Sequence, residues 1–263
     1  MNKIKVLIVD DSALVRQVLS AIINAEPDME VVAACMDPIF AREKIKSLNP
    51  DVLTLDVEMP RMDGITFLDK LMRLRPMPVV MISTLTEAGA DTTLKALELG
   101  AIDYVSKPKT DIGRGLRDDY ATEVVTKIRI AANSKVFARR VINTSDAAAQ
   151  EPPALLGLRT TESIIAIGAS TGGTEAIKQV LVSMPADAPG IVITQHIPAA
   201  FAGPFAKRMN DSSRIKVTLA DDGQQILPGH AYIAPGDQHL QVVRSGARYL
   251  CRVFRGEPVN RHI

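Results

Sequence analysis

The chain has 263 residues, enough for one large domain or two ordinary ones, and its hydrophobic fraction of 46% is typical of a globular protein. A formal net charge of +1 gives no long-range field toward nucleic acid or a membrane, and an aromatic content of 4% without Trp argues against base-stacking surfaces. No apolar run approaches the roughly 18 residues of a membrane span, and Cys35 and Cys251 lack metal-like spacing, so a reduced, cytoplasmic location is expected.

The first half of the chain alternates between apolar strands and amphipathic helices. Strands are predicted at 4–9, 31–34, 51–56, 79–84 and 103–106, and helices at 13–25, 38–48, 65–74, 91–99 and 119–137. Repeated strand–helix units of this kind predict a doubly wound, five-stranded parallel sheet.

Polar residues follow the ends of four of these strands. They are Asp10, Asp11, Asp56, Ser83 and Lys107. Ligands of such sheets gather outside the carboxyl ends of the strands, and converging carboxylates repel one another unless a hard cation lies between them. Mg²⁺ suits oxygen ligands, and Asp56 could then attack phosphorus while Lys107 and Ser83 bind the phosphoryl oxygens. The alternative is that each acid only caps a helix or lies solvated at a strand end.

The motifs VDDS, TLDVEMPRMDG, MIST and SKP in this half resemble the response-regulator receiver family. The resemblance implies a flavodoxin-like fold and phosphorylation of Asp56 by a partner histidine kinase. It also implies that Mg²⁺ is held by Asp11, Asp56 and the backbone carbonyl of Glu58, with Asp10 assisting through water. Tyr104 would be the switch aromatic, and Lys107–Pro108 would be a cis peptide bond.

The alternation of apolar strands and amphipathic helices ends between about Arg139 and Arg159, where Ser, Ala, Gln and a Pro pair predict a linker. We therefore expect a receiver domain at 1–125, a helix end and linker at 126–159, and a second domain at 160–263.

The second domain begins with the stretch SIIAIGASTGG, Ser163 to Gly173. An apolar strand ends at a glycine-rich turn that contains Ser170, and an amphipathic helix follows. Three interpretations of the turn remain open: a nucleophile beside an oxyanion site of backbone N–H groups, a phosphate cradle, or a structural turn in which the serine caps the helix.

His196 follows the next predicted strand, GIVITQ at 190–195. A neutral imidazole is the base that a serine nucleophile requires, and successive parallel strands often open on one crevice. A helix at 199–209 is expected to be broken at Gly203-Pro204. A further strand is predicted at 215–220, followed by turns that contain His230 and His239, and a hairpin of 238–243 with 249–254. No later acid sits convincingly at a parallel strand end.

The motifs IAIGASTGGTEAI, ITQHIPAAF, LPGHAYIAPGD and GEPVNRH resemble the chemotaxis protein-glutamate methylesterase family, CheB. The resemblance implies hydrolysis of glutamate γ-methyl esters on methyl-accepting chemoreceptors and deamidation of receptor glutamines, without a cofactor in the esterase part. Ser170 would be the nucleophile, His196 the base, and Thr171 a neighbour of the oxyanion site through its backbone.

The family's catalytic aspartate lies in a later glycine-rich segment, for which this sequence has no counterpart. The chain is therefore expected to be a C-terminally truncated member with an incomplete α/β methylesterase domain and impaired activity. In the unphosphorylated protein the receiver would cover the crevice that holds Ser170. Phosphorylation of Asp56 would rearrange that interface. The alternative is a receiver linked to a non-catalytic α/β signalling or binding module, and no partner role for nucleic acid or membrane insertion is expected.

Overall fold

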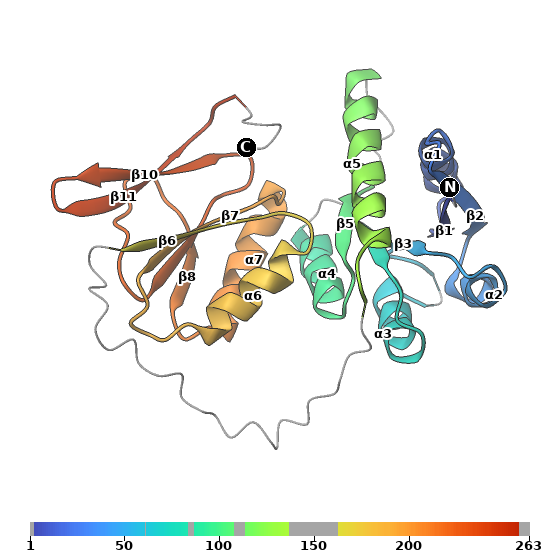
Figure 1. Cartoon of the computed structure of the whole chain (residues 1–263), viewed down its shortest axis with the longest axis horizontal. Coiled ribbons are helices and arrows are strands. Elements are labelled where there is room, and N and C mark those ends of the chain that lie inside the picture. Colours follow the sequence, from blue (N-terminus) through green and yellow to red (C-terminus); the bar gives the residue numbers. More distant parts are fainter. Residues whose placement is uncertain (1–2, 61, 84–86, 108–113, 137–162, 258–263) are drawn as a thin grey trace, which may run out of the picture. The chain divides into compact units, whose positions relative to one another are not determined.

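The computed structural model describes residues 3–60, 62–83, 87–107, 114–136 and 163–257. The chain divides into two compact units, Met1–Val141 and Ile142–Ile263 (Figure 1). Within the described ranges, no helix is both long enough and apolar enough to cross a membrane.

Unit 1 is a five-stranded parallel sheet with helices between successive strands (Figure 1). Its elements in chain order are β1 (Ile4–Val9), α1 (Ala13–Asn24), β2 (Met29–Cys35), α2 (Pro38–Leu48), β3 (Val52–Asp56), α3 (Gly64–Leu74), β4 (Val79–Ser83), α4 (Glu87–Glu98), β5 (Asp103–Ser106) and α5 (Arg114–Ala132). The strand order is β2-β1-β3-β4-β5. The order reverses beside β1, so the ends of β1 and β3 open on a crevice at the carboxyl edge. The predicted doubly wound sheet is confirmed.

Every residue of the central strands β3 and β4 is buried. Since side chains alternate between the two faces of a sheet, these strands are buried on both faces. Val6 and Ile8 of β1 pack with Leu19 of α1 and Val124 of α5 in one buried cluster. The neighbouring residue Leu7 is also fully buried and belongs to the opposite face. The continuous apolar runs of the sequence therefore follow from burial of the sheet between two helical layers.

Helix α5 differs from the predicted range of 119–137, since it runs from Arg114 to Ala132. At its end, the side chains of Asn133 and Ser134 donate hydrogen bonds to the carbonyl oxygens of Arg129 and Ile130. Such local bonds compete with continuation of a helix, which explains the earlier end.

Unit 2 contains a four-stranded parallel sheet and a separate antiparallel hairpin (Figure 1). Its elements are β6 (Ile164–Ala169), α6 (Gly173–Ser183), β7 (Gly190–Gln195), α7 (Ala199–Ser212), β8 (Lys216–Leu219), β9 (His230–Ile233), β10 (His239–Ser245) and β11 (Arg248–Phe254). The order of the parallel sheet is β6-β7-β9-β8, so β6 and β7 are neighbours. The hairpin packs through Cys251, which is fully buried in a cluster with Val192 and Tyr232.

Two predictions for unit 2 are wrong. Helix α7 continues through Pro204, although proline lacks the backbone N–H that would donate a helical hydrogen bond. Burial of Phe201, Phe205 and Met209 along one side of α7 stabilises the helix despite this loss. The segment around His230 is a strand, β9, rather than a turn. The predicted hairpin of 238–243 with 249–254 is confirmed as β10 and β11, and His239 is the first residue of β10 rather than part of the preceding turn. Strand β9 has only four residues between turn signals, so pattern alone did not show it; parallel pairing with β7 on one side and β8 on the other fixes it.

Candidate functional sites

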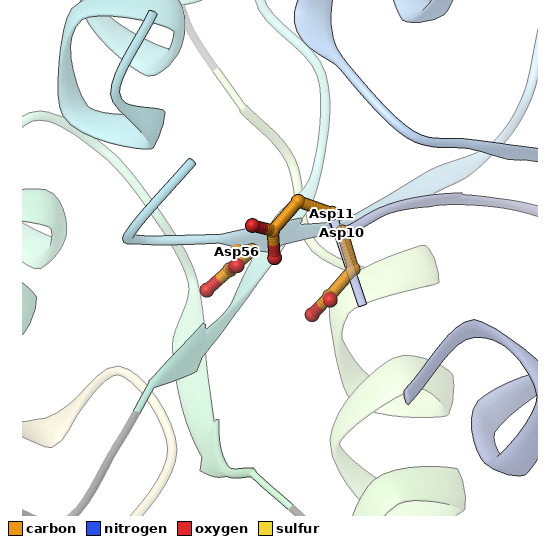
Figure 2. A group of neighbouring side chains, drawn as sticks. All are labelled: Asp10, Asp11 and Asp56. Atoms are coloured by element: carbon orange, nitrogen blue, oxygen red, sulfur yellow. The ribbon is translucent and has the colours of Figure 1, made fainter. Parts of the chain in front are cut away.

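Three carboxylates meet at the carboxyl edge of the sheet in unit 1. Asp10 follows β1, Asp11 is next to it, and Asp56 ends β3, which pairs with β1 in parallel. One oxygen from each of the three lies within 4.8 Å of the others (Figure 2). Asp10 and Asp56 are fully buried, whereas Asp11 is exposed. The structure thus brings together the acids that the sequence placed at two strand ends.

The turn after β1 is held from both sides. The backbone N–H of Ser12 donates to Oδ1 of Asp10 at 2.8 Å, and Ser12 is also the N-cap of α1. From α1, Nη1 of Arg16 donates to the backbone carbonyls of Asp10 and Asp11 at 2.7 and 2.9 Å. Arg16 therefore holds the backbone of the acidic pair in place, a role that sequence reasoning missed. Its position about one helical turn after the N-cap Ser12 was the available signal.

Lys107 reaches the cluster from the end of β5. Its Nζ lies 2.7 Å from Oδ2 of Asp56 and 3.9 Å from Oδ2 of Asp10. Burial alone would lower the pKa of Lys107, but the hydrogen bond to Asp56 and the charges of Asp56 and Asp10 raise it above its usual value. The lysine therefore stays charged and supplies a fixed cation at the site.

Burial dominates the electrostatics of Asp56. Loss of hydration raises the pKa of Asp56 to about 6, against the lowering effect of the hydrogen bond from Lys107. Burial likewise raises the pKa of Asp10, with Lys107 opposing it. Two buried carboxylates share one lysine, so negative charge exceeds positive charge at this site. A bound cation would offset the excess and stabilise the site.

The donor set of this cluster fits a hard divalent cation. All three side chains offer carboxylate oxygens, which Mg²⁺ prefers, and Oδ2 of Asp10 is buried without a hydrogen-bond partner among the described atoms. The backbone N–H of Glu58 donates to Oδ1 of Asp56 at 3.2 Å, which places Glu58 beside the cluster. That the carbonyl oxygen of Glu58 binds Mg²⁺ stays a prediction.

Ser83 is the last residue of β4, the strand that pairs with β3, and it is buried. Oγ1 of Thr93, on α4, donates to Oγ of Ser83 at 2.7 Å, so a helix of unit 1 contacts the hydroxyl that is predicted to bind a phosphoryl oxygen. Tyr104 is buried in β5, and Nζ of Lys127 lies 4.9 Å from the centre of its ring. The Lys107–Pro108 peptide bond lies outside the described residues.

Ser170 and His196 lie at the carboxyl ends of two neighbouring parallel strands in unit 2. Ser170 follows β6 and His196 follows β7, whose last residues Ala169 and Gln195 are Cα partners in register. The backbone N–H of His196 also donates to the carbonyl of Ala169 at 3.1 Å. Both residues are exposed. The structure therefore brings the predicted nucleophile and base to one edge of one sheet.

Ser170 does not cap the helix that follows it. The N-cap of α6 is Gly172, with φ of 73° and no side-chain cap hydrogen bond, and the carbonyl of Ser170 accepts from the N–H of Gly173 at 2.7 Å. Left-handed backbone of this kind favours glycine. The structural reading of Ser170 as a helix cap is wrong, and Thr171 lies in the turn between the serine and the first N–H groups of α6.

The residue that links the two turns is Gln195, which sequence reasoning missed. Its Nε2 donates to the carbonyl of Ser170 at 3.0 Å and lies 3.4 Å from the carbonyl of His196. A Cβ atom on Gly173 would lie 2.1 Å from Oε1 of Gln195, so the helix start can approach this amide only through a glycine. The signal in the sequence was the position of Gln195, immediately before the histidine.

Comparison with known proteins assigns a family to each half of the chain. Residues 6–113 match the response regulator receiver domain, and residues 165–262 match the CheB methylesterase family. The chain is 58% identical over 264 aligned residues to protein-glutamate methylesterase/protein-glutamine glutaminase 1 of Xanthomonas campestris pv. campestris, covering 98% of this chain and 74% of that protein. This chain belongs to the protein-glutamate methylesterase/protein-glutamine glutaminase family.

Other relatives of the family show the same pattern. The protein of the same name from Geobacter metallireducens is 58% identical, with 98% of this chain and 72% of the relative covered. The crystal structure of the response regulator domain of Thermotoga maritima CheB is 45% identical, with 51% of this chain and 99% of that chain covered and a TM-score of 0.46. Membership in this family identifies an enzyme with a receiver domain and disfavours the alternative of a non-catalytic signalling module.

Proposed function

We propose that this protein hydrolyses glutamate γ-methyl esters of methyl-accepting chemoreceptors and deamidates receptor glutamines. The observation that carries the proposal is the placement of Ser170 and His196 at the ends of the paired strands β6 and β7, in a chain of the methylesterase family. We assign Ser170 as the nucleophile and His196 as the general base.

The chemistry follows from these two side chains. His196 takes the hydroxyl proton while Oγ of Ser170 attacks the side-chain carbonyl of the substrate. The bond from carbon to the methoxy oxygen then breaks, and the same imidazole returns its proton to that oxygen, so methanol leaves; a glutamine substrate releases ammonia. Water, deprotonated by His196, then attacks the acyl-enzyme and restores the serine.

The oxyanion formed in each step needs hydrogen-bond donors. We infer that backbone N–H groups at and after Thr171 supply them, because the first N–H groups of a helix have no partner within the helix. The position of Thr171 directly before the N-cap Gly172 supports this role. No residue of this chain is assigned as the acid that orients His196.

Phosphorylation of Asp56 regulates this activity in our proposal. Asp56 attacks the phosphorus of the donor's phosphohistidine, and the bond from phosphorus to the imidazole nitrogen breaks, so the donor leaves as a free histidine. Lys107 pairs with the transferred phosphoryl oxygens, and Ser83 hydrogen-bonds one of them. Asp10, Asp11, Asp56 and the Glu58 carbonyl would hold Mg²⁺. When bound, the cation neutralises charge that develops on the phosphoryl group. A chemotaxis histidine kinase is the proposed phosphodonor, and a cytoplasmic location is part of the proposal because such a kinase draws its phosphate from ATP.

Substitution of the serine tests the nucleophile. In the purified protein, Ser170→Ala should abolish methanol release from a methylated chemoreceptor and labelling by a serine-directed acylating reagent. Ser183→Ala is the matched control, since Ser183 is exposed at the end of α6 and its hydroxyl donates to the carbonyl of Val180. Retained turnover or labelling in Ser170→Ala would remove the assignment.

Substitution of the aspartate tests the phosphoacceptor. Asp56→Asn should abolish phosphoryl uptake from a small phosphodonor such as acetyl phosphate and leave basal esterase activity in place. Asp69→Asn serves as control, because Asp69 pairs with Arg73 on α3, away from the acidic cluster. Continued labelling of Asp56→Asn would place the phosphoacceptor elsewhere.

A further inference from the structure

A groove of about 450 Å³ lies between α2 and α3 of unit 1, and none of the three clustered aspartates lines it. Apolar side chains of both helices line it: Ile39 from α2, and Phe67, Leu71 and Leu74 from α3. Ile39 is 58% exposed and Leu74 is 81% exposed, while Phe67 and Leu71 are buried. Large apolar side chains that remain exposed around a concave surface are typical of a binding site.

The charged side chains that line the groove are all basic. They are Arg42 and Lys46 from α2, Lys70 from α3, and Arg75 just after α3. No acidic side chain is among the described residues that line it. Asp69, which precedes Lys70, pairs with Arg73 at 2.9 Å instead of contributing to the groove.

Arg75 also gives the groove a fixed shape. Its Nη1 donates to the carbonyl of Ile45 on α2 at 2.9 Å, and its Nη2 donates to the side chain of Asn49. These bonds tie the end of α3 to the end of α2. The groove is therefore built before any partner arrives, which lowers the entropic cost of binding.

We propose that this groove binds an acidic amphipathic segment of a partner protein. The apolar lining would accept one face of a short helix, and Arg42, Lys46 and Lys70 would face the acidic residues beside it. The concave shape favours a protein segment over a membrane, because a flat bilayer surface would not reach the buried ring of Phe67. All residues that line the groove belong to unit 1, whereas Ser170 and His196 belong to unit 2.

A designed peptide pair tests the proposal on the whole 263-residue chain. The probe is a helical peptide of about 18 residues with Leu at i, i+3, i+4 and i+7 spacing and Glu at the flanking positions; the comparison peptide carries Lys in place of Glu. With ¹⁵N-labelled protein, the Glu peptide should cause saturable shifts at Ile39, Phe67, Leu71 and Leu74. The Lys peptide should bind at least about 10-fold more weakly, because its charges repel the basic rim.

Surface variants locate the binding site. Leu74→Asp and Arg42→Glu should each weaken binding of the Glu peptide by about 10-fold or more, since one removes an apolar contact and the other inverts a rim charge. Leu14→Asp is the matched control, because Leu14 is 50% exposed on α1 and does not line the groove. Both altered positions are exposed, so the variants should keep the wild-type spectrum elsewhere.

Four results would overturn the proposal. They are absence of saturable shifts, equal binding of the Lys peptide, shifts that map away from α2 and α3, and undiminished binding by both groove variants. Sedimentation and vesicle assays address other occupants. A concentration-dependent dimer that Leu74→Asp abolishes would assign the groove to a second copy of the chain, and binding to anionic phospholipid vesicles that Arg42→Glu abolishes would assign it to lipid.

Discussion

The side-chain amide of Gln195 donates a hydrogen bond to the backbone carbonyl of Ser170, with Nε2 and O 3.0 Å apart. The donor is the last residue of β7 and the acceptor is the first residue after β6. One side chain therefore joins the turn of the proposed nucleophile to the turn that presents His196. Such a link limits the relative movement of two groups that must exchange a proton.

Removal of this link should slow the chemistry more than it weakens substrate binding. The substitution Gln195→Met keeps the length of the side chain but removes the hydrogen-bond donor. We expect kcat for ester hydrolysis to fall by about 10-fold, the equivalent of one hydrogen bond, with little change in KM. Steady-state kinetics with Gln241→Met, a change on the exposed part of β10, provide the comparison. A purely raised KM would assign Gln195 to substrate binding instead.

The buried carboxylate of Asp56 should make the receiver less stable as pH rises. Because burial raises the pKa of Asp56 to about 6, the folded state holds this proton more tightly than the unfolded state does. The free energy of unfolding should then fall between about pH 4 and pH 6 through this group and stay lower above that range.

Asp56→Asn removes this effect. In EDTA at pH 7.5 the variant should be more stable than wild type, on the order of 1–3 kcal/mol, and the difference should shrink toward pH 4. Urea unfolding at both pH values measures it, with Asp69→Asn as the exposed control. A variant less stable than wild type at pH 7.5 would show that the ion pair with Lys107 outweighs the burial of the charge.

Loss of the Arg16 guanidinium should disturb the acidic pair without removing a carboxylate. Arg16→Met deletes the donor to the carbonyls of Asp10 and Asp11 and leaves the aliphatic part of the side chain. We expect a loss of stability of about 1–3 kcal/mol and a several-fold higher Mg²⁺ concentration for half-maximal phosphorylation. Arg73→Met, at an exposed ion pair on α3, should change neither quantity. An unchanged Mg²⁺ dependence in Arg16→Met would limit Arg16 to a stabilising role.

The first residue of α6, Gly173, should not tolerate a side chain. Gly173→Ala would place a Cβ atom 2.1 Å from Oε1 of Gln195 and 2.6 Å from Cβ of Ala169, so the helix or the amide must shift. We expect a loss of about 1–3 kcal/mol in unfolding free energy. Gly203→Ala, inside α7 with nothing within 4 Å of the new atom, should instead stabilise by about 1 kcal/mol. Urea unfolding of both variants decides, and equal effects would contradict the close approach at Gly173.

The sequence alone was sufficient to predict the five strand–helix units of unit 1 and the edge of the sheet at which the acids meet. In a parallel sheet, a polar residue directly after an apolar run must lie at the carboxyl edge, so Asp10 and Asp56 were predictable from position alone. Ser170 and His196 were predictable for the same reason. The continuous course of α7 through Pro204 was not, because it depends on burial of Phe201 and Phe205 against other elements.

Local pattern thus determined which residues stand at strand ends in this protein, since hydrophobic runs and turn residues are properties of neighbours along the chain. Only the tertiary structure decided what fixes them there: Arg16 on the carbonyls of the acidic pair, Thr93 on Ser83, and Gln195 between Ser170 and His196. The same holds for β9, which exists as a strand because β7 and β8 supply its hydrogen bonds. Contacts between residues distant in sequence depend on register and packing, and no local periodicity encodes them.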